Sequence, residues 1–258
     1  MILFVFEGQE REVDIFNALK QLYFSDEEVI VEFTYNTGFH TLYKELKKSD
    51  MSLFRVLQEA SKKRAVDKLG GYMEDDFSEV FLVFDYDFHN KNVALEQWNK
   101  NLGEMLAYFD DETKNGKMYV NYPMVESIRY TKELPDKDYW KYTVRRDECL
   151  KIKGDPTSGF KFKAAEFSAY LGLDFIQITE GKTQAERDAV RKNWNYLKWQ
   201  NVAKAHYLCE GQNTFPRKKT LFSQASIFDA QCEKYVDTDD CCVAILNSFP
   251  IFLYEYFK

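Results

Sequence analysis

The chain has 258 residues, of which 45% are hydrophobic and 30% are charged, and its formal net charge of −7 argues against a general nucleic-acid-binding protein. No apolar run approaches the ~20 residues that a membrane helix needs, and no basic region precedes the first apolar run, so we expect neither a membrane span nor a signal peptide. The five cysteines form no CxxC pair and the histidines number three, so we expect reduced thiols in a cytoplasmic protein rather than a zinc site.

The first predicted element is the apolar run from Ile2 to Phe6, which is followed by Glu7 and Gly8. A continuous run of this kind is typical of a strand buried on both faces, as in a parallel sheet covered by helices. Gly8 permits a tight turn, and a helix of about 14 residues is expected after it. Because ligands bind beyond the carboxyl ends of such strands, Glu7 is expected at the functional edge.

The next elements repeat this alternation. We expect strands over 29–35, 80–84 and 117–120, helices over 41–47, 52–64 and about 93–109, and a loop over 110–116. Pro123 suits the first turn of a helix, which would place Glu126 in that turn. The alternation predicts a parallel α/β sheet flanked by helices and ending near residue 125.

Beyond residue 130 the sequence shows no clear strand. Helices are expected over 161–171, from a capping box at 183–186 to about 208, and over 221–235, with short buried helices near Pro250. We therefore predict an α/β catalytic domain over 1–130 and a mainly α-helical C-terminal domain over 131–258 that binds substrate or a partner. Most of the excess negative charge lies in the first domain, whereas the second has slightly more basic than acidic residues.

Acidic residues follow three of the predicted strands. In Asp85-x-Asp87, alternate residues of an extended segment point to the same side, so both carboxylates can hold one hard cation that polarises a phosphate and activates water. Singly, the aspartates suit a polar turn, and Glu7 and Glu126 suit helix starts. Their convergence at one edge favours a shared site. Since only His89 is nearby, Mg²⁺ or Mn²⁺ is expected in preference to zinc.

These motifs resemble a known family. Glu7-Gly8 after the first strand and Asp85-Tyr86-Asp87 after a later one are similar to the TOPRIM domain of topoisomerases, primases and OLD-type nucleases. The match is closer to the RloB-like and abortive-infection TOPRIM proteins, which include the effector of the PARIS anti-phage system. Their first motif, roughly E-G-x-x-T-E-x-x-Y-F, matches residues 7–16 except at Arg11 and Ile15. Their N-P-x-F-E segment resembles residues 122–126, and residues 246–256 resemble a C-terminal motif of related defence proteins.

The resemblance implies a phosphodiesterase centre that uses Mg²⁺ or Mn²⁺. Asp85 and Asp87 would be catalytic metal ligands, Glu7 would be a ligand or the general acid–base, and Glu12 and Glu126 would be secondary ligands. The resemblance further implies a toxic effector of anti-phage defence, an ATPase partner that restrains it, and tRNA rather than DNA as the favoured substrate. A homodimer is left open.

A substrate-binding face is predicted on the second domain, where basic and aromatic residues are interleaved. Basic groups neutralise phosphates, and aromatic rings stack on unpaired bases. The alternative is a solvated helix face with the aromatic residues in the core, and the sequence does not separate the two. The candidate nucleic-acid-binding residues are Lys151, Lys153, Lys161, Lys163, Arg187, Arg191, Arg217, Lys218 and Lys219.

The leading hypothesis is a metal-dependent TOPRIM endonuclease. The main alternative is a non-catalytic TOPRIM-fold module that binds an ATPase partner. The DxD pair alone also suits a nucleotide-sugar transferase, but such enzymes usually need a larger donor-binding domain. A topoisomerase would need a further domain with a nucleophilic tyrosine and a primase usually has a zinc module, so neither suits this chain.

Overall fold

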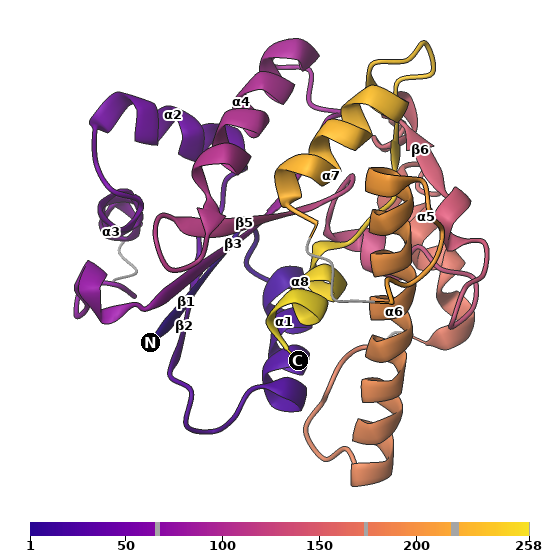
Figure 1. Ribbon diagram of the computed structural model, residues 1–258, viewed down its shortest axis with the longest axis horizontal. Coiled ribbons are helices and arrows are strands. Elements are labelled where there is room, and N and C mark those ends of the chain that lie inside the picture. The colour runs from indigo at the N-terminus through magenta and orange to yellow at the C-terminus, as the bar shows by residue number, and fades with distance from the viewer. Residues whose placement is uncertain (65–67, 173–174, 218–221, 258) are drawn as a thin grey trace.

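A five-stranded, mostly parallel sheet organises the chain (Figure 1). The computed structural model describes residues 1–64, 68–172, 175–217 and 222–257. The strands are β1 (Ile2–Phe6), β2 (Ile30–Thr34), β3 (Glu79–Asp85), β4 (Asp110–Asp111) and β5 (Gly116–Asn121), in the order β2-β1-β3-β5-β4. β4 pairs antiparallel with β5, where a loop was expected, and the other pairings are parallel. The α/β class and the helix-flanked sheet are confirmed.

Helices cover both faces of this sheet. They are α1 (Arg11–Tyr23), α2 (Phe39–Ser49), α3 (Leu53–Lys63), α4 (Leu95–Tyr108) and the C-terminal α8 (Ser248–Tyr256). Figure 1 shows α2, α3 and α4 on one side and α1 and α8 on the other. Phe4 of β1 contacts the layer formed by α1 and α8. Its ring centroid lies 4.1 Å from that of Phe16 on α1 and 5.5 Å from that of Phe252 on α8. The end of the chain therefore completes the cover of the N-terminal sheet.

The rest of the chain beyond residue 130 is mainly helical, as expected. It contains α5 (Phe160–Phe167), α6 (Gln184–Glu210) and α7 (Gln224–Gln231). The predicted capping box begins α6, since the Thr183 hydroxyl accepts from the Glu186 N–H and the Glu186 carboxylate accepts from the Thr183 N–H. The expectation of no strand was wrong, because β6 (Thr143–Arg145) pairs antiparallel with β7 (Cys242–Ala244). Strands of three residues are too short to show an alternation in sequence.

Short irregular helices connect these elements. They are the 3₁₀ helices Glu74–Asp76, Val125–Arg129, Tyr139–Lys141, Arg146–Glu148 and Ala169–Leu171, and the π-helical turn Cys232–Val236. The helix expected at Pro123 is thus a 3₁₀ helix that begins two residues later. None of the helices in the described ranges is both long and apolar enough to cross a bilayer.

The two parts of the chain share one hydrophobic core. A buried lysine adds a polar connection between α6 and the segment before it. The Lys204 ammonium donates to the carbonyls of Tyr139 and Tyr142, at 3.1 and 2.6 Å, and lies 4.9 Å from the Tyr139 ring centre. These contacts fix residues 139–142 against α6. The predicted division of the chain into two domains at residue 130 is a statement about which parts fold independently, and it stays a prediction.

Candidate functional site

Six acidic residues line one hollow at the carboxyl edge of the sheet, namely the exposed Glu10 and the five predicted site residues. Glu7 follows β1, Glu12 lies in the first turn of α1, Asp85 ends β3, Asp87 follows it, and Glu126 lies in the 3₁₀ helix after β5. The strand register explains the gathering, because β1, β3 and β5 are parallel neighbours whose carboxyl ends meet. The hollow has a volume of about 470 Å³. We call these five residues the acid cluster.

Backbone and amide groups hold the innermost acids in place. The backbone N–H of Asp85 donates to Oε2 of Glu7 at 2.9 Å, and the amide of Asn121 on β5 donates to Oδ1 of Asp85 at 3.0 Å. The sequence suggested that residues 85–87 are extended throughout, but they are not. Asp87 has a φ of 47°, in the left-handed region, so the chain turns there. His89 then lies with Nε2 3.8 Å from Oδ1 of Asp87.

The acid cluster is electrostatically unfavourable without a counter-charge. Burial raises the pKa of Glu7 to about 8, and the nearby Asp87 carboxylate adds to this effect. Burial, and then the charge of Glu7, raises the pKa of Asp85 well above its usual value. Burial is also the main cause that raises the pKa values of Glu12 and Asp87. A buried group of like charges that favours protonation is common at functional sites, although structural networks also produce it.

Two basic side chains form ion pairs with Glu126 of the acid cluster. Its side chain is 1% exposed, and Oε1 lies 2.9 Å from Nη1 of Arg11 and 3.1 Å from Nζ of Lys161. The other carboxylate oxygen, Oε2, has no hydrogen-bond partner among the described residues. Lys161, which the sequence had suggested as a nucleic-acid-binding residue, comes from the start of α5. A lysine far along the chain therefore supplies positive charge to the acidic edge.

The donor chemistry of the hollow suits a hard divalent cation. All five acids offer oxygen, which Mg²⁺ and Mn²⁺ prefer, and Oε2 of Glu126 is buried without a hydrogen bond. In their present side-chain positions, no three His, Cys, Asp or Glu residues within the described ranges lie close enough together to hold a metal ion. The residues therefore fit such an ion in kind, and holding it would require side-chain rotation.

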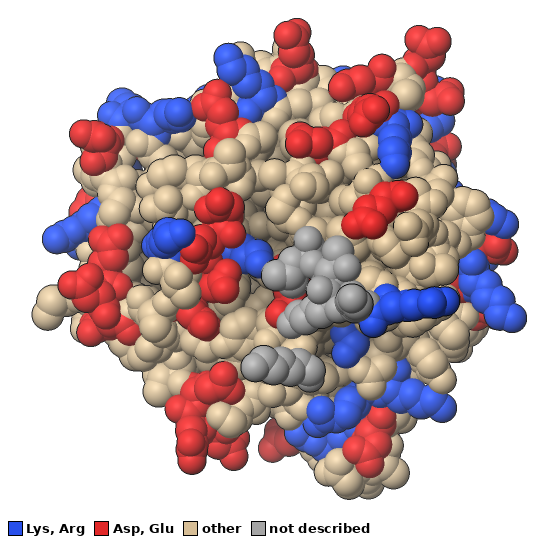
Figure 2. Space-filling view, in the orientation of Figure 1, with Lys and Arg blue, Asp and Glu red and all other residues tan. Residues whose placement is uncertain are grey.

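Most of the other predicted basic residues lie elsewhere. Lys163 pairs with Glu148 at 3.6 Å, Arg187 donates to the backbone and side-chain oxygens of Gln21, and Arg191 lies 5.1 Å from the ring centre of Tyr23. The last two contacts tie α6 to the end of α1. Lys151, Lys153 and Arg217 are exposed and do not line the acidic hollow, and Lys218 and Lys219 lie outside the described residues. On the face drawn in Figure 2, acidic and basic side chains are interspersed over the upper part and left, and basic side chains gather toward the lower right.

Sequence reasoning missed three residues near the acid cluster. The sequence motifs assign no role to Asn121 or Arg129, and Arg11 stands out in them only as a departure from the family pattern. Asn121 carried a signal, since a polar residue ends a buried strand beside Asp85. The position of Arg129 depends on the 3₁₀ helix after β5, which the sequence did not reveal.

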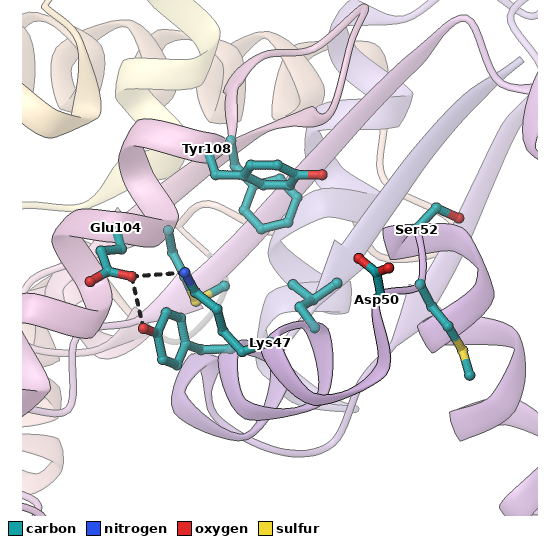
Figure 3. Close-up of a pocket in the computed structure, with 10 residues that line it drawn as sticks. Lys47, Asp50, Ser52, Glu104 and Tyr108 are labelled. Carbon is teal, nitrogen blue, oxygen red and sulfur yellow. Dashed lines mark hydrogen bonds and ion pairs between the residues drawn. The ribbon is translucent and has the colours of Figure 1, made fainter.

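A second hollow of about 400 Å³ lies between α2 and α4, at the ends of these helices (Figure 3). Lys47 and Glu104 point toward each other across it, 3.1 Å apart, and the Tyr43 hydroxyl donates to Glu104 at 2.8 Å. These polar groups satisfy one another on an otherwise largely apolar surface. The acidic hollow is therefore the stronger candidate for chemistry.

Comparison with known proteins adds no relative. No family model, no curated protein and no solved structure matches this chain. The likeness to TOPRIM proteins rests on the sequence motifs, and the function has to be argued from the site itself.

Proposed function

We propose that the chain is a metal-dependent endonuclease that hydrolyses phosphodiester bonds at the acid cluster. The observation that carries the proposal is the meeting of acids from three parallel strands around one hollow, with a lysine beside them. Buried carboxylates of raised pKa are costly to maintain, and a divalent cation would stabilise their ionised forms. Such a cation promotes phosphodiester hydrolysis, together with groups that transfer protons and stabilise negative charge.

Each residue has a role that follows from its position. Asp85, Asp87 and Glu126 would hold the cation, with Glu12 as a further oxygen donor. The cation, when bound, supplies Lewis-acid polarisation of a phosphate and a more acidic water. Burial raises the pKa of Glu7 and a bound cation would lower it again, so Glu7 would serve as the general acid–base. The ammonium of Lys161 can stabilise negative charge that develops on the phosphate oxygens.

The biological part of the proposal follows the family resemblance. It takes tRNA in preference to DNA as the substrate, toxicity in anti-phage defence as the role, and an ATPase as the restraining partner. The raised pKa values and the geometry of the acid cluster bear on the chemistry alone, so the chemistry is tested first.

The direct test is cleavage by the purified chain of end-labelled tRNA and DNA, with Mg²⁺, with Mn²⁺ and with EDTA. We expect cleavage with either metal and none with EDTA. Asp85→Asn should reduce the rate by a factor of about 10³, comparable to losing other major electrostatic contributions to catalysis. Glu104→Gln is the matched control, because it neutralises an acid in the second hollow and should leave the rate unchanged. If the folded wild type cuts neither substrate with any divalent metal, the alternative of a non-catalytic module is favoured.

A further inference from the structure

A third hollow adjoins the acidic one. It has a volume of about 370 Å³, and it shares Glu10, Arg11, Val125 and Glu126 with the acidic hollow. The two hollows therefore adjoin each other at the start of α1 and the 3₁₀ helix Val125–Arg129. The volume is in the range of pockets that receive small organic ligands. A group bound at the acid cluster could therefore extend into this neighbour, which we call the side groove.

The side groove contains two guanidinium groups. Arg11 lies at its junction with the acidic hollow, and its side chain is 53% exposed although it pairs with Glu126. Arg129, at the end of the 3₁₀ helix, donates from Nε to the Ser168 hydroxyl at 3.3 Å. Among the described residues no carboxylate lies within ion-pairing distance of Arg129. This half-buried cation, with a neutral hydroxyl as its hydrogen-bond partner, is suited to an anion.

The neighbourhood of Arg129 strengthens this interpretation. Burial lowers the pKa of Arg129, the positive charge of Arg11 lowers it further, and the negative charge of Glu126 opposes both effects. Glu126 pairs directly with Arg11 but not with Arg129, so a further anion in the groove would offset the remaining repulsion between the two guanidinium groups. Glu10 and Asp14 also line the groove, but both are exposed to solvent, where their charges are screened.

The floor of the groove is aliphatic. Ile15, Val125, Ile128 and Ile176 line it, and each is nearly fully buried. Gln177 adds a polar amide to the wall. Basic groups next to a flat apolar floor can bind a phosphate together with the sugar or base attached to it. A base held in a duplex is stacked and paired, so an unpaired nucleotide would enter at lower cost.

We propose that the side groove receives the unpaired nucleotide next to the scissile phosphodiester, with its phosphate at Arg11 and Arg129 and its base or sugar on the aliphatic floor. This inference rests on the proposed nuclease function and specifies its substrate as a single-stranded or locally unpaired strand. Arg11 and Arg129 are positioning residues, which set where the strand lies relative to the acid cluster.

The test measures binding of a short fluorescein-labelled single-stranded DNA by fluorescence anisotropy, in EDTA and over a range of KCl concentrations, so that no metal-loaded activity is needed. Arg129→Gln should weaken binding about tenfold, the value of one charge-assisted contact. It should also reduce the slope of log K against log salt by about 0.7, the value for one phosphate contact on a single strand. Gln177→Glu, which adds a charge without changing the size of the side chain, should weaken binding in the same direction.

Arg55→Gln is the matched control, because Arg55 is an exposed arginine on α3 and its loss changes the net charge equally. It should leave binding nearly unchanged, and Arg129→Lys should retain the salt slope of the wild type. On a duplex of the same sequence, Arg129→Gln should have no larger effect than Arg55→Gln. Thermal unfolding of each variant checks that it is folded.

The inference is overturned if Arg129→Gln and Gln177→Glu bind the single strand as Arg55→Gln does. In that case, metal-dependent cleavage by the wild type would leave the nuclease proposal standing. A loss on duplex equal to the loss on the single strand would contradict the unpaired nucleotide. If the wild type binds no single strand, the side groove is excluded, and the cleavage assay decides separately whether the nuclease proposal also fails.

Discussion

The acidic hollow and the hollow between α2 and α4 contain nearly the same ion pair. Lys161 lies 3.1 Å from Glu126 in the first, and Lys47 lies 3.1 Å from Glu104 in the second. The Glu104 side chain is 39% exposed and accepts a hydrogen bond from Tyr43, whereas that of Glu126 is 1% exposed. Distance alone does not distinguish these pairs. Their surroundings do.

The neighbouring acids show what the surroundings change. Hydrogen bonds from Tyr43 and then Lys47 lower the pKa of Glu104, so its ionised form is the stable one. Around Glu126, burial raises the pKa values of Glu7 and Asp85, so their ionised forms are the unstable ones. In the second hollow, the charge of Glu104 is already balanced and hydrogen-bonded. The acid cluster gains from a ligand that brings positive charge.

The largest effect that should separate the two regions, without added metal, is the pH dependence of stability. The pKa of Glu7 is about 8 in the folded chain and 4.5 in the reference state, so between these values the folded state holds a proton that the unfolded state has lost. Titration of Glu7 alone therefore makes stability fall as the pH rises from 5 to 8, by at most about 4 kcal/mol at about 1.4 kcal/mol per pH unit, and the raised pKa values of Glu12, Asp85 and Asp87 act in the same direction. Glu7→Gln cannot ionise, so its melting temperature in EDTA should fall less over this range.

Glu104→Gln is the control for this measurement. Since the pKa of Glu104 is lowered, its titration is complete below pH 5, and the variant should follow the wild type between pH 5 and 8. A Glu7→Gln variant whose melting temperature falls as steeply as that of the wild type would show that Glu7 is not the strained group.

A smaller effect is expected from removing each lysine. Lys161→Met leaves Arg11 as the remaining ion-pair partner of buried Glu126 among the described residues. Because the Lys161 side chain is 65% exposed, we expect a loss of about 1 kcal/mol, between the values for exposed and buried pairs. Lys47→Met should leave the free energy of unfolding unchanged in denaturant titrations. Equal losses in the two variants would contradict the contrast between the hollows.

The sheet and its acidic edge could be anticipated from sequence because their signals are local. Continuous apolar runs identify β1 and β3, and a carboxylate directly after each run must lie at the same edge when the strands are parallel. Glu126 lies five residues after the end of a third parallel strand, β5, in the 3₁₀ helix that follows it. The position of these acids in space therefore follows from the strands next to them in sequence.

The basic side of the site could not be anticipated, because it depends on packing between distant segments. Lys161 was grouped with other lysines of the second domain, yet α5 lies against the 3₁₀ helix after β5 and brings it to Glu126. Arg129 depends on the same contact through Ser168. No periodicity in the sequence encodes which of several exposed cations will meet the acid cluster.

The most direct test of the central claim is the effect of Mg²⁺ on thermal unfolding, measured for the wild type, Asp85→Asn and Glu104→Gln at the same pH. At a free concentration of 100 times the dissociation constant, binding adds about 2.7 kcal/mol, or roughly 5–10 °C for a chain of this size. We predict this gain for the wild type and for Glu104→Gln, and its loss in Asp85→Asn. A folded Asp85→Asn variant that retains the full gain, or a wild type that shows none, would contradict the account.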